Sequence, residues 1–128
     1  MRRRIFILLC LMLPLVFFSQ TGFAGTPSKS VKTMATILNY VNHYPGDDEK
    51  QKLNKIVHSK KASDQEKAIA SAMINLNHSA SSADKRKLSK IVDDSSAPQA
   101  VRDLARIVRD LNHKPSSSDK KILKKYMW

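Results

Sequence analysis

Equal spacing of 35 residues separates three copies of an Asn-His pair: Asn42-His43, Asn77-His78 and Asn112-His113. Imidazole nitrogens are common ligands for zinc and copper, so one hypothesis is a histidine-dependent metal site. The other hypothesis is structural. Asparagine tolerates the left-handed backbone at helix ends, and a histidine near a helix C-terminus interacts well with the exposed carbonyl groups there.

Geometry favours the structural hypothesis if the three pairs belong to stacked units. Stacked helices lie roughly 8–10 Å apart, so we expect equivalent histidines at about that spacing. Zinc needs each nitrogen at about 2.0–2.1 Å, which three collinear histidines cannot provide for one ion. We therefore predict no cofactor and no metal, and keep His43, His78 and His113 as the alternative, metal-binding prediction. A further alternative is that the amides of Asn42, Asn77 and Asn112 hold an extended peptide.

The 35-residue interval extends well beyond the histidines. Residues 31–57, 66–92 and 101–127 align without a gap, and six of the 27 aligned columns are identical in all three. The identical columns are Ala35/Ala70/Ala105, Asn42/Asn77/Asn112, His43/His78/His113, Lys50/Lys85/Lys120, Leu53/Leu88/Leu123 and Lys55/Lys90/Lys125. Periods of 20 to 50 residues are typical of stacked supersecondary units.

Each unit has the pattern of two helices joined by a short turn. Apolar residues recur at steps of three and four before each Asn-His pair, and a second, shorter apolar stripe follows it. Four Ser-x-x-acid or Ser-x-x-Gln motifs predict helix starts: Ser63-x-x-Glu66, Ser81-x-x-Asp84, Ser96-x-x-Gln99 and Ser116-x-x-Asp119. No apolar residues alternate with a period of two, so we expect no sheet.

One helical hairpin cannot bury both its faces, whereas three stacked hairpins can share a core. We therefore predict an all-α fold of three tandem helical-hairpin repeats, stacked as a short α-α solenoid or a compact bundle. The predicted single domain covers residues 25–128, with repeats at 28–62, 63–97 and 98–128.

The first 24 residues have the pattern of a secretory signal peptide. Arg2, Arg3 and Arg4 precede an apolar run, and Gly22 and Ala24 form a small-x-small cleavage site. The run is too short for a comfortable membrane span of about 20 residues. We predict cleavage after Ala24 and a periplasmic or secreted protein.

Composition excludes several classes of site. The lone cysteine, Cys10, lies in the predicted signal peptide, which rules out an intramolecular disulfide framework and a cysteine-based zinc cluster. Three glycines are too few for a Gly-rich phosphate loop, and there is no GxSxG, HExxH or suggestively paired carboxylate. We predict that the protein is not an enzyme.

The chain is strongly basic, with 23 Lys and Arg against 11 Asp and Glu and a net charge of +12. Residues 25–128 hold 20 of these basic residues and all 11 acidic ones, which leaves +9. The predicted second helices carry the clearest concentrations of positive charge: Lys50, Lys52, Lys55, Lys85, Arg86, Lys87, Lys90, Lys120, Lys121, Lys124 and Lys125. One interpretation is a solvated outer face that maintains solubility.

The other interpretation of these residues is a binding surface. We predict a small exported, non-enzymatic binding or scaffolding module that uses them with Asn42, Asn77 and Asn112. Expected partners are an anionic lipid, lipopolysaccharide, a cell-wall polymer or an acidic protein. Nucleic acid is disfavoured, because the aromatic residues do not interleave with the basic ones. The alternative function is a histidine-dependent metal-binding protein of the periplasm.

Overall fold

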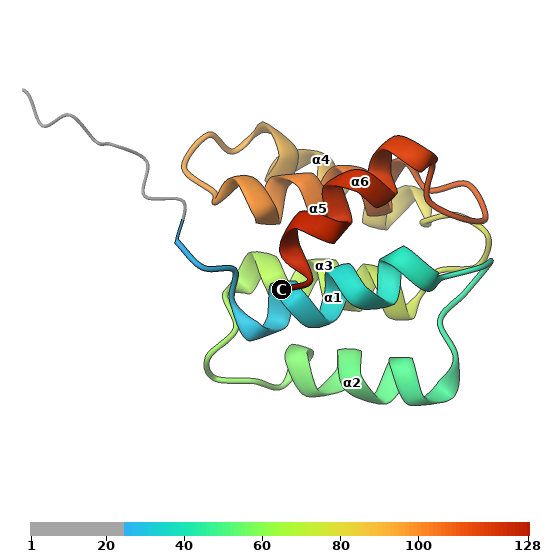
Figure 1. The fold of residues 1–128 in the computed structure, drawn as a ribbon, viewed down its shortest axis with the longest axis horizontal. Helices are drawn as coiled ribbons and strands as arrows, with labels where there is room; N and C mark the ends of the chain where they lie inside the picture. The colour runs from blue at the N-terminus through green and yellow to red at the C-terminus, as the bar shows by residue number, and fades with distance from the viewer. Residues whose placement is uncertain (1–24) are drawn as a thin grey trace, which may run out of the picture.

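A computed structural model describes residues 25–128; the predicted signal peptide lies outside this range. The described residues form six helices and no strand, which confirms the predicted all-α class. The helices are α1 (Lys29–Tyr40), α2 (Asp47–Val57), α3 (Asp64–Ile74), α4 (Ser82–Asp93), α5 (Gln99–Asp110) and α6 (Ser117–Tyr126) (Figure 1). None of them has the length and apolar character that a bilayer span requires.

The helices form a closed bundle rather than an open solenoid. Helices α1, α3 and α5 all contact one another at the centre. Each remaining helix packs chiefly on the next central helix along the chain: α2 on α3, α4 on α5, and α6 back on α1. The last of these contacts closes the ring, so the compact-bundle form of the prediction is the one observed.

The core occupies equivalent positions in the three helix pairs. Two identical columns, Ala35/Ala70/Ala105 and Leu53/Leu88/Leu123, are fully buried at every occurrence. The small alanine side chains lie on the central helices, and the leucines lie on the outer helices that cover them. Burying one such leucine contributes roughly 2 kcal/mol to stability. Because both columns are buried at every occurrence, they mark core positions.

Three of the four predicted helix starts are confirmed. At Ser63, Ser81 and Ser116 the hydroxyl oxygen accepts a hydrogen bond from the backbone N–H of the residue three positions later. The prediction at Ser96 is wrong, because α5 begins later, with Pro98 as its N-cap. Proline disfavours the helical conformation at the residue before it, so Ala97 cannot be the first helical residue. The Ser96 hydroxyl donates to Asp94 instead, at 2.5 Å.

Candidate metal centre

The three Asn-His pairs lie in the loops α1–α2, α3–α4 and α5–α6, which gather at one end of the molecule (Figure 1). Each histidine has a left-handed backbone, with φ of 73° at His43, 66° at His78 and 64° at His113. The prediction that the asparagines take this conformation is therefore wrong. The helices end two or three residues before each asparagine, and the chain reverses at the histidine.

A ring of backbone hydrogen bonds joins the three histidines. The His43 N–H donates to the His113 carbonyl at 2.6 Å, and the His78 N–H to the His43 carbonyl at 2.8 Å. The His113 N–H closes the ring by donating to the His78 carbonyl at 2.7 Å. Each histidine is thus both donor and acceptor, and the three loops are fixed around one common axis.

The imidazole rings contact one another around this axis. Their centroids are 4.9 Å apart for His43 and His78, 5.0 Å for His43 and His113, and 4.8 Å for His78 and His113, each in an edge-to-face arrangement. One ring nitrogen from each lies within 4.8 Å of the others. The predicted spacing of 8–10 Å is wrong, because it assumed a linear stack, whereas closure of the bundle turns all three loops inward.

This cluster has the composition of a site for a late first-row transition metal. Its three potential ligands are all imidazoles, which suit zinc, copper and nickel, whereas calcium and magnesium prefer oxygen. Nitrogens around tetrahedral zinc lie roughly 3.3 Å apart. The nitrogens must therefore approach by up to roughly 1.5 Å, and rotation of the rings, two of which are exposed, can supply this. Three protein ligands leave a fourth position for water or another group.

An asparagine supports one of the rings. The Nδ1 atom of His113 lies 2.6 Å from the Oδ1 atom of Asn112. Histidine ligands commonly donate their second ring N–H to an oxygen, which fixes the tautomer and orients the ring. In this arrangement Nδ1 carries the proton and Nε2 of His113 is the free ligand atom. The side chains of Asn42 and Asn77 are exposed.

The structure does not bring the predicted basic residues together. They lie on α2, α4 and α6, which make no contact with one another. Their side chains are exposed except at Lys50 and Lys120, which are half-buried. The Lys50 Nζ atom lies 5.9 Å from the centre of the Tyr44 ring, a distance at which a cation–π interaction is favourable. The basic surface is therefore divided among three separate helices.

The repeated pattern also misses five residues that line a cavity between α1 and α2. They are Lys29, Ser30, Thr33, Ser59 and Lys61. Lys29, Ser30 and Thr33 occupy columns in which the three units carry different residues, and Ser59 and Lys61 differ from Asp94 and Ser96 in the second unit. A search for identical columns passes over them, and only some of them, such as Lys29 with Asp64 at the equivalent position, are marked by a difference in charge.

Comparison of the chain with protein-family models, with curated proteins and with solved structures finds no match.

Proposed function

We propose that the protein binds a late first-row divalent metal ion, with Zn²⁺ as the reference ion, through His43, His78 and His113. The observation that carries the proposal is the convergence of three imidazoles, with ligand nitrogens within 4.8 Å, on a ring of backbone hydrogen bonds. Because the backbone of the three loops is already fixed, less conformational entropy is lost when the histidines bind an ion. It also accounts for the use of the same residue in all three loops.

Backbone strain supports the same proposal. A left-handed backbone costs a residue with a Cβ atom roughly 1–2 kcal/mol, and glycine adopts it freely. Around His43 and His113 the N–H of the following residue bonds the carbonyl of the preceding one, at 3.0 and 2.8 Å. Such three-residue turns with positive φ are rare and strained. Glycine would serve the turn better, so the side chain is what the position requires, and strain of this kind gathers at functional sites.

We further propose that the protein is exported and consists of three tandem repeats. The signal-like segment at residues 1–24 supports export, and the six identical columns support the repeat. The proposed role is binding, without catalysis. The two described cavities lie beside α1 and α2, and no histidine lines either of them. A catalytic metal needs a shaped cavity that excludes water, whereas two of these three histidines are exposed.

Calorimetric titration with Zn²⁺ and Cu²⁺ tests the proposal. We expect one ion per chain in the wild-type protein and no specific binding after simultaneous His43→Ala, His78→Ala and His113→Ala substitution. The matched control is His58→Ala, because His58 is an exposed histidine outside the cluster, with Nδ1 2.9 Å from the Asn54 carbonyl. Circular dichroism establishes that the variants remain helical. Equal binding by the folded triple variant would contradict the proposal.

Cobalt provides a second measurement. Tetrahedral Co²⁺ gives strong visible absorption, so a complex with the three histidines and one water is expected to be coloured. Because the ligands must be deprotonated, we expect the colour to be lost on acidification. A spectrum typical of octahedral Co²⁺ in water, unchanged by the protein, would contradict this arrangement.

A further inference from the structure

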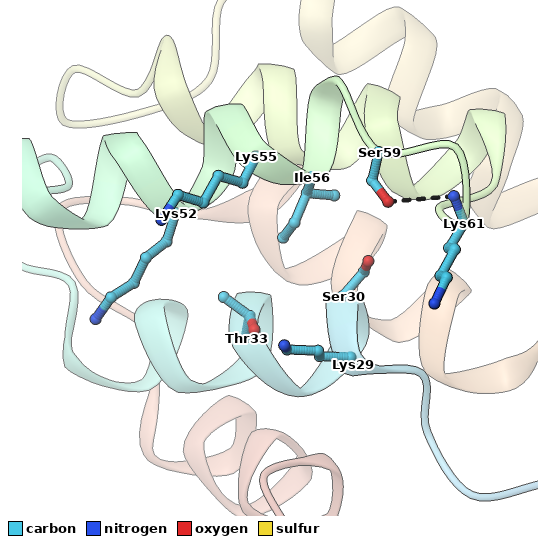
Figure 2. A pocket seen from close by; sticks show the side chains of 8 residues that line it. All are labelled: Lys29, Ser30, Thr33, Lys52, Lys55, Ile56, Ser59 and Lys61. Carbon is cyan, nitrogen blue, oxygen red and sulfur yellow. Dashed lines mark hydrogen bonds between the residues drawn. The ribbon is translucent and has the colours of Figure 1, made fainter.

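We propose that the cavity between α1 and α2 binds a small anion that carries two phosphate groups. This cavity has a volume of about 390 Å³. It is lined by Lys29, Ser30, Thr33, Lys52, Lys55, Ile56, Ser59 and Lys61 (Figure 2). Four ammonium groups and three hydroxyl groups therefore surround one space, and no carboxylate is among its lining residues.

None of the four lysines forms an ion pair. The only ion pairs within residues 25–128 are Arg106–Asp119 and Arg109–Asp110, both of which involve α5 and neither of which involves the cavity. Helix α1 also begins here and has no acidic residue in its first turn. Its N-terminal N–H groups add partial positive charge at the same place. The cavity is thus a concentration of positive charge without an ion-pair partner.

One carboxylate does bond to the start of α1, beside the cavity, but it is held by other groups of the protein. The buried carboxylate of Glu66 accepts hydrogen bonds from the Ser28 hydroxyl at 2.5 Å and from the Ser63 N–H at 2.9 Å. Ser28 is the N-cap of α1, so Glu66 fixes the start of this helix against α3. It does not line the cavity, and the lysines there remain available to an external anion.

Two of the equivalent positions in the second unit carry a carboxylate. Asp64 stands in the column of Lys29, and Asp94 in the column of Ser59. Asp94 accepts a hydrogen bond from Gln65 at 2.7 Å, across the equivalent groove. Bonds from Ser96 are the main reason that the pKa of Asp94 is lowered, so this carboxylate stays negative.

The third unit is also altered. Asp103 stands in the column of Thr33 and Tyr126 in that of Ile56, and the Tyr126 hydroxyl donates to Asp103 at 2.6 Å. If the lysines served only for solubility, there would be no reason for one groove alone to lack carboxylates. The charge distribution therefore points to a ligand of the first unit.

The shape of the cavity indicates the class of anion. Lys52 and Lys61 lie at opposite ends of it, with Ile56 between them (Figure 2). A second cavity of about 280 Å³ shares Thr33 and Lys52 and continues along α1 past Lys32. An elongated site with cations at both ends and an apolar residue between them fits two phosphate groups on a short body, either free or as a lipid headgroup. Lysine and hydroxyl donors form charge-assisted hydrogen bonds with such oxygens.

Titration of the full chain with inorganic pyrophosphate, in metal-free buffer at low salt, tests this proposal. The test variant is Lys52→Gln with Lys55→Gln, and the matched control is Lys87→Gln with Lys90→Gln at the same columns of α4. We expect the test variant to weaken the affinity by at least about tenfold, since hydrogen bonds to charged groups are lost, and the control to change it less than about twofold. Absence of binding, or equal loss in both variants, would overturn the proposal.

Sedimentation with vesicles that contain phosphatidylglycerol distinguishes the two sources of phosphate. Vesicle binding that pyrophosphate displaces and the α2 variant loses identifies a headgroup ligand, whereas pyrophosphate binding alone identifies a soluble one. Vesicle binding weakened equally by the α4 control, with no pyrophosphate binding, would overturn the proposal. The triple histidine variant is expected to bind pyrophosphate normally. The anion site and the proposed metal site can therefore be refuted separately.

Discussion

The two ends of α1 carry the two candidate sites, and these differ in how far their residues recur along the chain. At its C-terminal end, His43 joins His78 and His113 in one cluster of identical residues. At its N-terminal end, one helix length of about 18 Å away, the cavity combines Lys52 and Lys55 of α2, which recur as Lys87 and Lys90, with Lys29 of α1, which does not recur. A side chain on the common axis gives one site with three ligands. Side chains at equivalent positions away from the axis lie apart from one another, so each can belong to a different site.

Removal of one histidine is expected to have the largest effect. We expect His43→Ala, His78→Ala and His113→Ala each to weaken Zn²⁺ binding by at least about 100-fold, because each removes one of three ligands around the same ion. Calorimetry of the three single variants measures this. If one of them binds as the wild-type protein does, the three residues do not share an ion, and the axis has no special role.

Transfer of residues from the first groove to the equivalent groove between α3 and α4 tests whether those residues determine anion binding. Asp64→Lys with Asp94→Ser gives the α3–α4 groove the residues found at Lys29 and Ser59. We expect a second pyrophosphate site, so that the calorimetric stoichiometry rises from one to two.

A control for this transfer has the same change in net charge at exposed positions of α2. Asp47→Lys with Asp48→Ser is expected to leave the stoichiometry at one. An equal rise in both variants would show that net charge, and not the groove, determines binding.

A smaller effect is expected from the residue beside the ligand. Asn112→Ala removes the oxygen 2.6 Å from His113 Nδ1, so the ring loses its orientation. We predict a loss of about tenfold in Zn²⁺ affinity, the usual range for such supporting residues, with no change in pyrophosphate binding. Asn112→Asp, which retains an oxygen at this position, is the conservative control and is expected to keep most of the affinity. Unchanged Zn²⁺ affinity in the alanine variant would show that Asn112 does not support the metal site.

The smallest expected effect concerns the third unit. Burial, followed by the hydrogen bond to Asp103 and its charge, raises the pKa of Tyr126 to about 12. Because this pKa is above the ordinary value of about 10, the stabilisation is fully present below pH 10. It is lost as the pH rises through about 12. Ultraviolet titration measures the pKa, and the stability of Tyr126→Phe is expected to fall less over this interval. A tyrosine that titrates near pH 10 would contradict the contact.

Local signals in the sequence predicted most of the fold. The apolar periodicity located the six helices, and serine caps located three of their starts, because both depend on residues a few positions apart. The identical Leu53, Leu88 and Leu123 correctly marked the core. Closure was not predictable in this way. It depends on the contact of α6 with α1, which are far apart in sequence and carry no local mark of their pairing.

The candidate sites were predicted less well for the same reason. His43, His78 and His113 stood out as residues, but a linear stack would have kept their rings apart, and only closure brings them together. The left-handed conformation was assigned to the neighbouring asparagine, since both residue types tolerate it. The cavity depends on Lys29 and Lys61, which approach α2 from separate segments and belong to no repeated column.

The contact of α6 with α1 has a consequence for the connectivity of the chain. Since α6 packs on α1 as α2 packs on α3, the packing of the sixth helix on the first resembles packing across an ordinary interhelix loop. A circular permutant that begins in loop 58–63, with residue 128 linked to residue 25, would contain every helix contact of the original. Its three histidines would still meet, although their order along the polypeptide would be different.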